Sequence, residues 1–89
     1  MHAWHLLGND PAPEASGVYE LGTREGAVIY IGTSPNLAQA IARHLHAPDE
    51  GCRERAVWFR YEQTATYVAR ERALLLEYQA AHGSLPPCN

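Results

Sequence analysis

Two tyrosines are the first candidates for a reactive site, because each lies in a segment with the pattern of a strand and the two segments are close in the sequence. Tyr19 lies in an alternating run at residues 17–22, and Tyr30 lies in a short apolar run at residues 27–31 that is rich in β-branched residues. Both patterns are typical of strands, and a tight turn between them would pair the two runs. The pairing would bring two phenols close together. A strand tyrosine more often packs than reacts, so packing is the default interpretation of each phenol until other residues join them.

Glu77 is the third candidate, because its surroundings do not suit a carboxylate. In a helix its neighbours three and four positions away are Ala73, Leu74, Ala80 and Ala81, which are small or apolar. Burying an unpaired carboxylate costs several kcal/mol, so Glu77 needs a partner or solvent. The structural interpretation is an arginine partner or a position at the solvent edge. The functional interpretation is a hard cation, since Mg²⁺ is commonly held by one or two carboxylates with waters and phosphate oxygens.

The composition limits what can position these groups. The 89 residues, 46% of them hydrophobic, predict a single globular domain spanning 1–89. The net charge of −3 argues against strong binding of a polyanion by this chain alone. All seven basic residues are arginines, whose planar forks suit phosphate and surface ion pairs equally.

The cysteines, the apolar runs and the N-terminus together predict where in the cell the protein is located. Cys52 and Cys88 lack the spacing of a zinc site, and two free thiols in a reducing compartment are expected rather than one disulfide. No apolar run is long enough to cross a membrane, and the N-terminus does not resemble a signal peptide. The expected location is therefore the cytoplasm, without a membrane partner.

Turn and capping signals place the elements. Residues 23–26 suit a hairpin turn, and Ser34 followed by Pro35 suits the start of a helix running to about residue 46. A third strand is expected at residues 56–61. A second helix should begin near residue 64 or 66 and end at Gly83. The order β-β-α-β-α predicts an α/β (α+β) domain with a small three-stranded, mostly antiparallel sheet flanked by helices.

Four short motifs now converge on a family. Gly-Val-Tyr at 17–19, Tyr-Ile-Gly at 30–32, Leu-Leu-Leu-Glu at 74–77 and Pro-Pro-Cys-Asn at 86–89 occur in this order. The pattern resembles the GIY-YIG nuclease superfamily and is most similar to the amino-terminal nuclease domain of UvrC. The resemblance runs from residue 17 to residue 89, which is nearly the whole chain.

The resemblance implies an endonuclease that hydrolyses DNA phosphodiester bonds, with a role in DNA repair, using one divalent cation, Mg²⁺ or Mn²⁺. On this resemblance the cation ligand is Glu77. The implied catalytic residues are Tyr19, Tyr30 and His44, to which Arg43 is added below as a substitute for a missing arginine, and the implied substrate-binding residues are Gly32 and Asn89. A tyrosine would assist deprotonation of the attacking water, and an arginine would hold the charge that develops on phosphorus.

The chain departs from the family pattern at two basic positions. The usual helix arginine falls at Ala40, and the basic residue after Tyr-Ile-Gly falls at Thr33. Removing one transition-state donor typically lowers a rate by roughly 10²–10³. Arg43 lies three residues after Ala40, about 4.5 Å along a helix axis, and helical side chains lean toward the N-terminus. Arg43 is therefore expected to fold back and replace the missing guanidinium.

Three functions stay open from the sequence. The first is an active nuclease that binds DNA weakly when alone, because the chain is acidic, and that works with a partner protein or domain. The second is a nuclease-derived module that binds nucleic acid or protein without catalysis. The third is a structural domain in which the motif residues serve packing and Glu77 is ion-paired.

Overall fold

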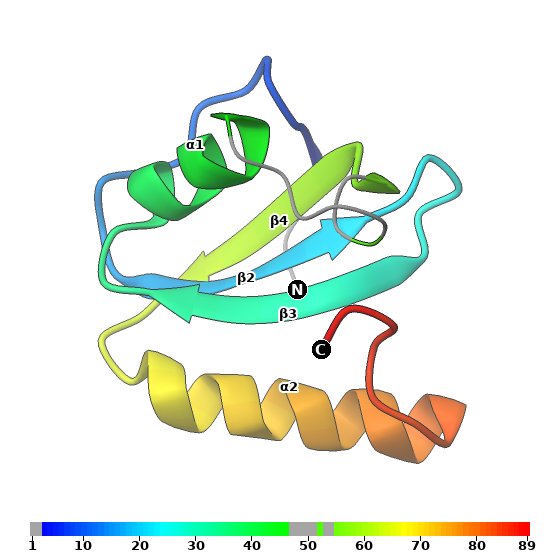
Figure 1. The fold of residues 1–89 in the computed structure, drawn as a ribbon. Helices are drawn as coiled ribbons and strands as arrows, with labels where there is room; N and C mark the ends of the chain where they lie inside the picture. The colour runs from blue at the N-terminus through cyan, green and yellow to red at the C-terminus, as the bar shows by residue number, and fades with distance from the viewer. Residues whose placement is uncertain (1–2, 47–51, 53–54) are drawn as a thin grey trace.

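The computed structural model describes residues 3–46, 52 and 55–89, which form an antiparallel sheet with a helix on each face (Figure 1). Helix α1 lies over one face and α2 lies under the other. The elements in chain order are β1 (His5–Leu6), β2 (Gly17–Gly22), β3 (Val28–Ser34), α1 (Leu37–His46), β4 (Trp58–Gln63) and α2 (Tyr67–His82).

The sheet has the strand order β1-β4-β2-β3, and every neighbouring pair is antiparallel. The three expected strands are present, and the short β1 adds a fourth at the free side of β4. The expected strand at 56–61 begins two residues later, at Trp58. Strand β3 continues beyond Gly32 to Ser34, because β2 pairs with it up to the Gly17–Ser34 position. The small α+β class with an antiparallel sheet is therefore confirmed, with four strands in place of three.

Successive side chains of β2 point alternately to the two faces of the sheet. Tyr19 and Leu21 pack in the core cluster under α1, together with Leu37 and Ile41 of that helix. Val18 packs with Leu74 of α2 on the opposite face. Because successive strand side chains point to opposite sides, each half of β2 serves a different helix.

Direct pairing with Leu21 decides where Tyr30 points. Residues directly opposite each other in an antiparallel pair share a face, so Tyr30 lies on the face of Leu21 and Tyr19. Beyond this pair the register shifts, because Gly22 pairs with Val28, and Ile29 is the extra residue of a β-bulge. Both Ile29 and Tyr30 contact the core cluster under α1.

Helix α1 begins at Leu37, two residues later than expected. Asn36 rather than Ser34 caps the first turn, since its Oδ1 accepts a hydrogen bond from the Gln39 amide at 3.2 Å. Two further first-turn amides, those of Leu37 and Ala38, donate to the carbonyls of the preceding loop at residues 13 and 15. The start of α1 is therefore satisfied by the protein itself and does not offer these amides to an anion.

The end of α2 agrees with the sequence. The helix ends at His82, and Gly83 follows in the left-handed conformation with φ of 80°. Its amide donates to the Gln79 carbonyl at 2.8 Å.

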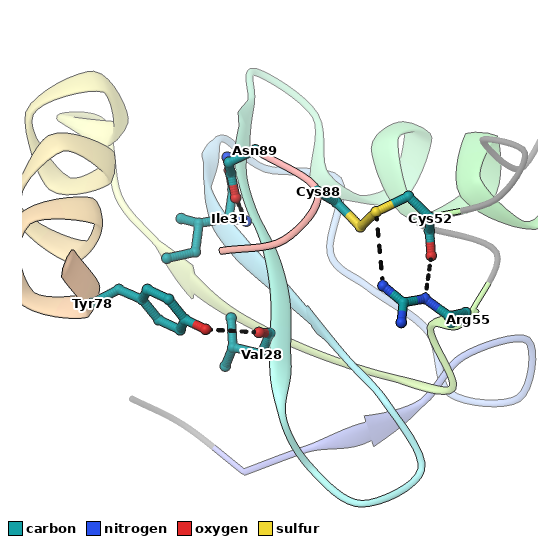
Figure 2. The surroundings of a disulfide bond; sticks show 7 residues. All are labelled: Val28, Ile31, Cys52, Arg55, Tyr78, Cys88 and Asn89. Atoms are coloured by element: carbon teal, nitrogen blue, oxygen red, sulfur yellow. Dashed lines mark hydrogen bonds between the residues drawn. A yellow bond between two sulfur atoms is a disulfide. The ribbon is translucent and has the colours of Figure 1, made fainter. Parts of the chain in front are cut away.

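The expectation of two free thiols is wrong. Cys52 and Cys88 form a disulfide with a Cα–Cα distance of 5.8 Å (Figure 2). The tail after α2 turns back along β3, where the Cys88 amide donates to the Ile29 carbonyl at 2.8 Å. This reversal brings Cys88 to a cysteine that is 36 residues away in sequence, which the local pattern did not reveal.

Candidate functional site

Three aromatic side chains meet under α1. The Tyr19 phenol oxygen lies 2.9 Å from Nε2 of His44, a hydrogen-bond distance. The Tyr30 ring centroid lies 6.0 Å from that of Tyr19 and 5.9 Å from that of His44. The His44 ring stands edge-on to both phenols, with interplanar angles of 63° and 61°. The structure therefore brings together the two tyrosines of the hairpin and the histidine of α1, as expected from the sequence.

Gly32 makes this arrangement possible. A Cβ at this position would lie 2.7 Å from Cε2 of Tyr30 and 2.8 Å from both Cζ and the phenol oxygen of Tyr19. Real Cβ atoms do not approach other atoms this closely, and both rings would have to move. The absent side chain of Gly32 thus leaves the space occupied by the phenol of Tyr19 from β2 and the ring of Tyr30 from β3 itself. Its role in this structure is to shape the site, while the predicted contact with substrate stays a prediction.

The phenols open into a hollow of about 300 Å³, named the phenol hollow below. Its lining residues are Tyr19, Tyr30, Thr33, Ser34, Pro35, Gln39, Ala40, Arg43 and His44. Ala40 is 7% exposed and Arg43 is exposed, so a small side chain sits at the base and a guanidinium lies at the rim. Both residues thus line the same hollow, and the expectation that Arg43 serves the space left by Ala40 stays a prediction.

Three lining residues with polar side chains were not predicted as site residues from the sequence. Thr33, Ser34 and Gln39 bring hydroxyl and amide groups to the phenol hollow. Gln39 precedes Arg43 by four positions, and residues at this spacing share one face of a helix. That spacing was the available signal, but it acquires meaning only once α1 is known to cover the phenols.

Glu77 lies elsewhere. It lines a second hollow of about 340 Å³, named the ionic hollow, whose other lining residues are Glu20, Val28, Arg60, Arg70, Leu74, Tyr78 and His82. Leu74, one turn before Glu77, packs on Val18 and Ile31, which belong to the face opposite the phenols. A cation that Glu77 holds beside Tyr19 and Tyr30, as the resemblance implies, would need the three residues in one hollow, and the structure places Glu77 in a separate one. The physical reason is that α2 covers one face of the sheet, whereas Tyr19 and Tyr30 point to the other.

The ionic hollow is a set of paired charges. Glu20, which is 5% exposed, accepts a hydrogen bond from Nε of Arg60 at 2.5 Å. Arg70 donates from Nε to Glu62 at 2.7 Å, and this bond is the main cause that raises the pKa of Arg70. Glu77 adds to that effect through its charge. Among the described residues of this face, Glu77 shares its hollow with Arg60 and Arg70. This favours the interpretation in which arginines, rather than a cation, balance the charge of this carboxylate.

The side chains that line the phenol hollow do not fit a divalent cation bound there as a cofactor. None of its lining residues carries a carboxylate. Within residues 3–46, 52 and 55–89, no group of three or more His, Cys, Asp or Glu side chains could hold a metal ion. In the ionic hollow, Glu20 is already committed to Arg60. The residues in place therefore do not build the shared metal site that the sequence motif implied.

Asn89 occupies the free edge of β3. Its side-chain oxygen accepts from the Ile31 amide at 2.9 Å, and its side-chain nitrogen donates to the Ile31 carbonyl at 2.8 Å (Figure 2). The side chain thus imitates a neighbouring strand beside the Tyr30 position. The structure gives Asn89 a role in closing the domain, and contact with substrate stays a prediction.

A family assignment follows from the comparison of the sequence with family models. Residues 4–81 match the model described as "Domain of unknown function (DUF7508)". The chain belongs to the DUF7508 family. A comparison with curated proteins finds no match for this DUF7508 domain.

The fold of the DUF7508 domain is similar to that of one solved structure in particular. This is the crystal structure of the GIY-YIG N-terminal endonuclease domain of UvrC from Thermotoga maritima, a point mutant bound to its catalytic divalent cation. The similarity has a TM-score of 0.60 and 24% sequence identity, and it covers 88% of this chain and 86% of the other. At this identity the likeness shows the fold, so the expected GIY-YIG-like architecture is confirmed.

The helices that the structure describes include none that is long and apolar enough to cross a membrane.

Proposed function

We propose that this DUF7508 domain is a DNA endonuclease that receives a backbone phosphate in the phenol hollow and hydrolyses the phosphodiester bond there. The observation that carries this proposal is the 2.9 Å contact between the Tyr19 phenol and His44 in an open hollow with Arg43 at its rim. The GIY-YIG-like fold supports it, because the similar UvrC domain is an endonuclease domain.

The Tyr19–His44 pair is suited to proton transfer. With Nε2 of neutral His44 unprotonated, the phenol of Tyr19 donates to it, and the imidazole can take the phenol proton as the phenol oxygen takes a proton from water. The hydroxide so formed attacks phosphorus, the bond from phosphorus to the leaving oxygen breaks, and that oxygen takes a proton from solvent. The pair of side chains therefore acts as one general base with two members.

Arg43 supplies the positive charge. A guanidinium binds phosphate oxygens through two parallel N–H bonds and remains protonated at any physiological pH. The small buried Ala40 leaves the wall of the hollow open one turn before Arg43. In this role Arg43 replaces the arginine that the family pattern places at Ala40.

A requirement for Mg²⁺ or Mn²⁺ is a separate expectation. The similar UvrC domain was solved with its catalytic divalent cation, and in the present chain the predicted ligand Glu77 faces the ionic hollow. None of the proton transfers proposed above passes through a cation. DNA repair as the setting, and a partner that strengthens DNA binding by this acidic chain, are likewise proposals that rest on the resemblance.

A second function is favoured by two specific observations. The phenol hollow has no carboxylate, and Ala40 stands at the position of the usual arginine. Both features suit a module that binds a DNA phosphate without cleaving the chain. The two functions differ in turnover and agree on the binding site.

One set of measurements separates them. Supercoiled plasmid, flap and bubble DNA are incubated with the domain in Mg²⁺, in Mn²⁺ and in EDTA, and nicking is followed on gels beside DNA affinity from fluorescence anisotropy. The endonuclease proposal requires nicking that Tyr19→Phe abolishes. Binding that Arg43→Gln weakens, without nicking in any condition, selects the binding module. Absence of both binding and nicking rejects both functions and leaves a structural domain.

A further inference from the structure

The tail after α2 covers the open edge of the sheet. Strand β3 is the last strand of the sheet, so one of its sides has no strand neighbour. The Cys88 amide donates to the Ile29 carbonyl, and the Asn89 side chain bonds both the amide and the carbonyl of Ile31. Pro86, which belongs to this tail, is fully buried. These contacts make the tail a substitute for the missing strand.

The tail forms hydrogen bonds with the residues of β3 that come directly before and directly after Tyr30. Its hydrogen bonds reach Ile29, one residue before the phenol, and Ile31, one residue after it. Ile29 is also the bulge residue directly before Tyr30, and both residues contact the core cluster under α1. The docked tail therefore fixes the backbone that aims this phenol.

The disulfide links the tail to a residue that follows α1 in the sequence. Cys88 packs against the core cluster under α1, and its partner Cys52 follows the end of α1 at His46 by six residues (Figure 2). Helix α1 carries Arg43 and His44, and the bond joins the tail to a cysteine that follows this helix in the sequence. Both cysteines are half-buried rather than enclosed.

We propose that the Cys52–Cys88 disulfide is a redox-sensitive clamp, which in the oxidised state holds the tail on β3 and sets Tyr30 against His44, and which on reduction releases the tail and loosens the phenol hollow. Release of the tail is a statement about the fold alone, whereas its effect on DNA rests on the proposed function. Without the bond, the tail is held on β3 by the Cys88 amide, the Asn89 side chain and the burial of Pro86, and each hydrogen bond contributes little net stability to so short a segment.

The chemistry needs a dithiol as reductant. One thiolate of the dithiol attacks a sulfur of the bond and displaces the other cysteine as a thiolate, and the second dithiol thiol then resolves the mixed disulfide. The dithiol is oxidised to its cyclic disulfide, and the two cysteines take up two electrons and two protons. The Arg55 guanidinium, with Nη2 3.9 Å from Sγ of Cys52 and Nε donating to the Cys52 carbonyl at 3.4 Å, stabilises a thiolate at Cys52. Cys52 is therefore the sulfur expected to leave.

Hydrogen exchange tests the clamp directly. The Ile31 amide, which is protected by Asn89, is compared with the amides of the central strand β2 in the oxidised chain and after reduction with dithiothreitol. We expect exchange of Ile31 to accelerate at least tenfold on reduction while β2 keeps its protection. Equal Ile31 exchange in the two states overturns the proposal, and so does loss of protection throughout the sheet, because the bond would then hold the whole fold rather than the tail.

Variants separate the bond from side effects of the reductant. The double variant Cys52→Ser with Cys88→Ser is expected to show fast Ile31 exchange with or without dithiothreitol. Arg55→Gln is expected to keep the bond and to slow its reduction severalfold. If the double variant keeps slow Ile31 exchange, the tail docks without the bond and the proposal fails.

The DNA assays then divide the outcomes between the two proposals. Faster Ile31 exchange together with severalfold weaker DNA binding on reduction supports both. Faster exchange in a chain that binds no DNA in either state supports the clamp and rejects the proposed function. DNA binding that is equal in the two states, despite a released tail, rejects the coupling of the clamp to the phenol hollow.

Discussion

Tyr19 and Glu77 lie on opposite faces of the sheet. Tyr19 packs under α1 with Leu37, while the helix that carries Glu77 rests on Val18 through Leu74. The carboxylate of Glu77 lines the ionic hollow and the phenol of Tyr19 lines the phenol hollow. In this chain, chemistry at the phenol hollow therefore has to be built from phenols, imidazole and guanidinium.

This separation yields the first prediction. Glu77→Gln is expected to change DNA affinity less than twofold, because the substituted group is not in the phenol hollow. Arg43→Gln is expected to weaken binding severalfold and to lower the salt slope of binding by about one. Anisotropy titrations over a range of salt concentrations measure both. Arg24→Gln, which removes an exposed arginine near the hairpin turn, is the matched control for net charge. A strong effect of Glu77→Gln would show that the carboxylate reaches the bound DNA.

The second prediction concerns proton transfer. Tyr19→Phe keeps the ring packing and removes the hydroxyl that faces His44, so any nicking rate should fall by about 10²–10⁴ while DNA affinity changes little. Tyr61→Phe, which removes the hydroxyl of the tyrosine paired with Tyr19 on β4, is the control and should keep the rate. Single-turnover nicking with saturating protein separates the chemical step from binding. Equal loss of rate in both variants would mean that general disturbance of the sheet, rather than the Tyr19 proton, is responsible.

The third prediction tests the space at Gly32. Gly32→Ala places a methyl group within 2.8 Å of both phenol rings, and overpacking of this kind costs about 1–3 kcal/mol of unfolding free energy. Both rings must also turn, so the near-ultraviolet circular dichroism of the tyrosines should change. Gly26→Ala in the hairpin turn meets no atom within 4 Å but has φ of 86°, so it should lower stability without altering that signal. An unchanged spectrum for Gly32→Ala would mean that the phenols do not meet over this glycine.

The fourth prediction compares the two ion pairs of the α2 face. Glu20 is 5% exposed and its partner Arg60 also lies over the Trp4 ring at 4.2 Å. Removing one member of a buried pair costs about 3–5 kcal/mol, and the partly exposed Arg60 side chain reduces the expected cost of Glu20→Gln to about 1–2 kcal/mol. For a domain of this size that change lowers Tm by roughly 4–15 °C.

Glu62→Gln is the control for that comparison. The Glu62–Arg70 pair is more exposed, so its loss should cost at most about 1 kcal/mol. Thermal unfolding of both variants measures the difference. Equal costs for the two substitutions would show that burial of Glu20 does not set the strength of its pair.

The sequence by itself determined the elements and their order. The signals for these elements are local ones: alternation in β2, the turn before β3, the helix-start residues before α1 and the glycine after α2. Each depends on the backbone preferences of a few consecutive residues, so the sequence pattern was enough to predict the element. The motif tyrosines and His44 were also placed together correctly, because two strands of one hairpin and the helix that follows leave little freedom. The disulfide and the cap at Asn36 were missed, and the sheet was predicted with three strands in place of four, since each of these features depends on where a distant segment or a neighbouring side chain comes to lie.

Only the tertiary structure decided the side of the sheet on which each group acts. Glu77 follows an apolar run whose first member, Leu74, docks on Val18 and Ile31, and this contact commits the whole helix to the face away from the phenols. Nothing in the spacing of Glu77 from Tyr19 or Tyr30 carries that information, because a helix after the last strand can pack on either face. The path of the tail along β3 was decided in the same way, through a contact between Cys88 and Ile29, which lie far apart in the chain.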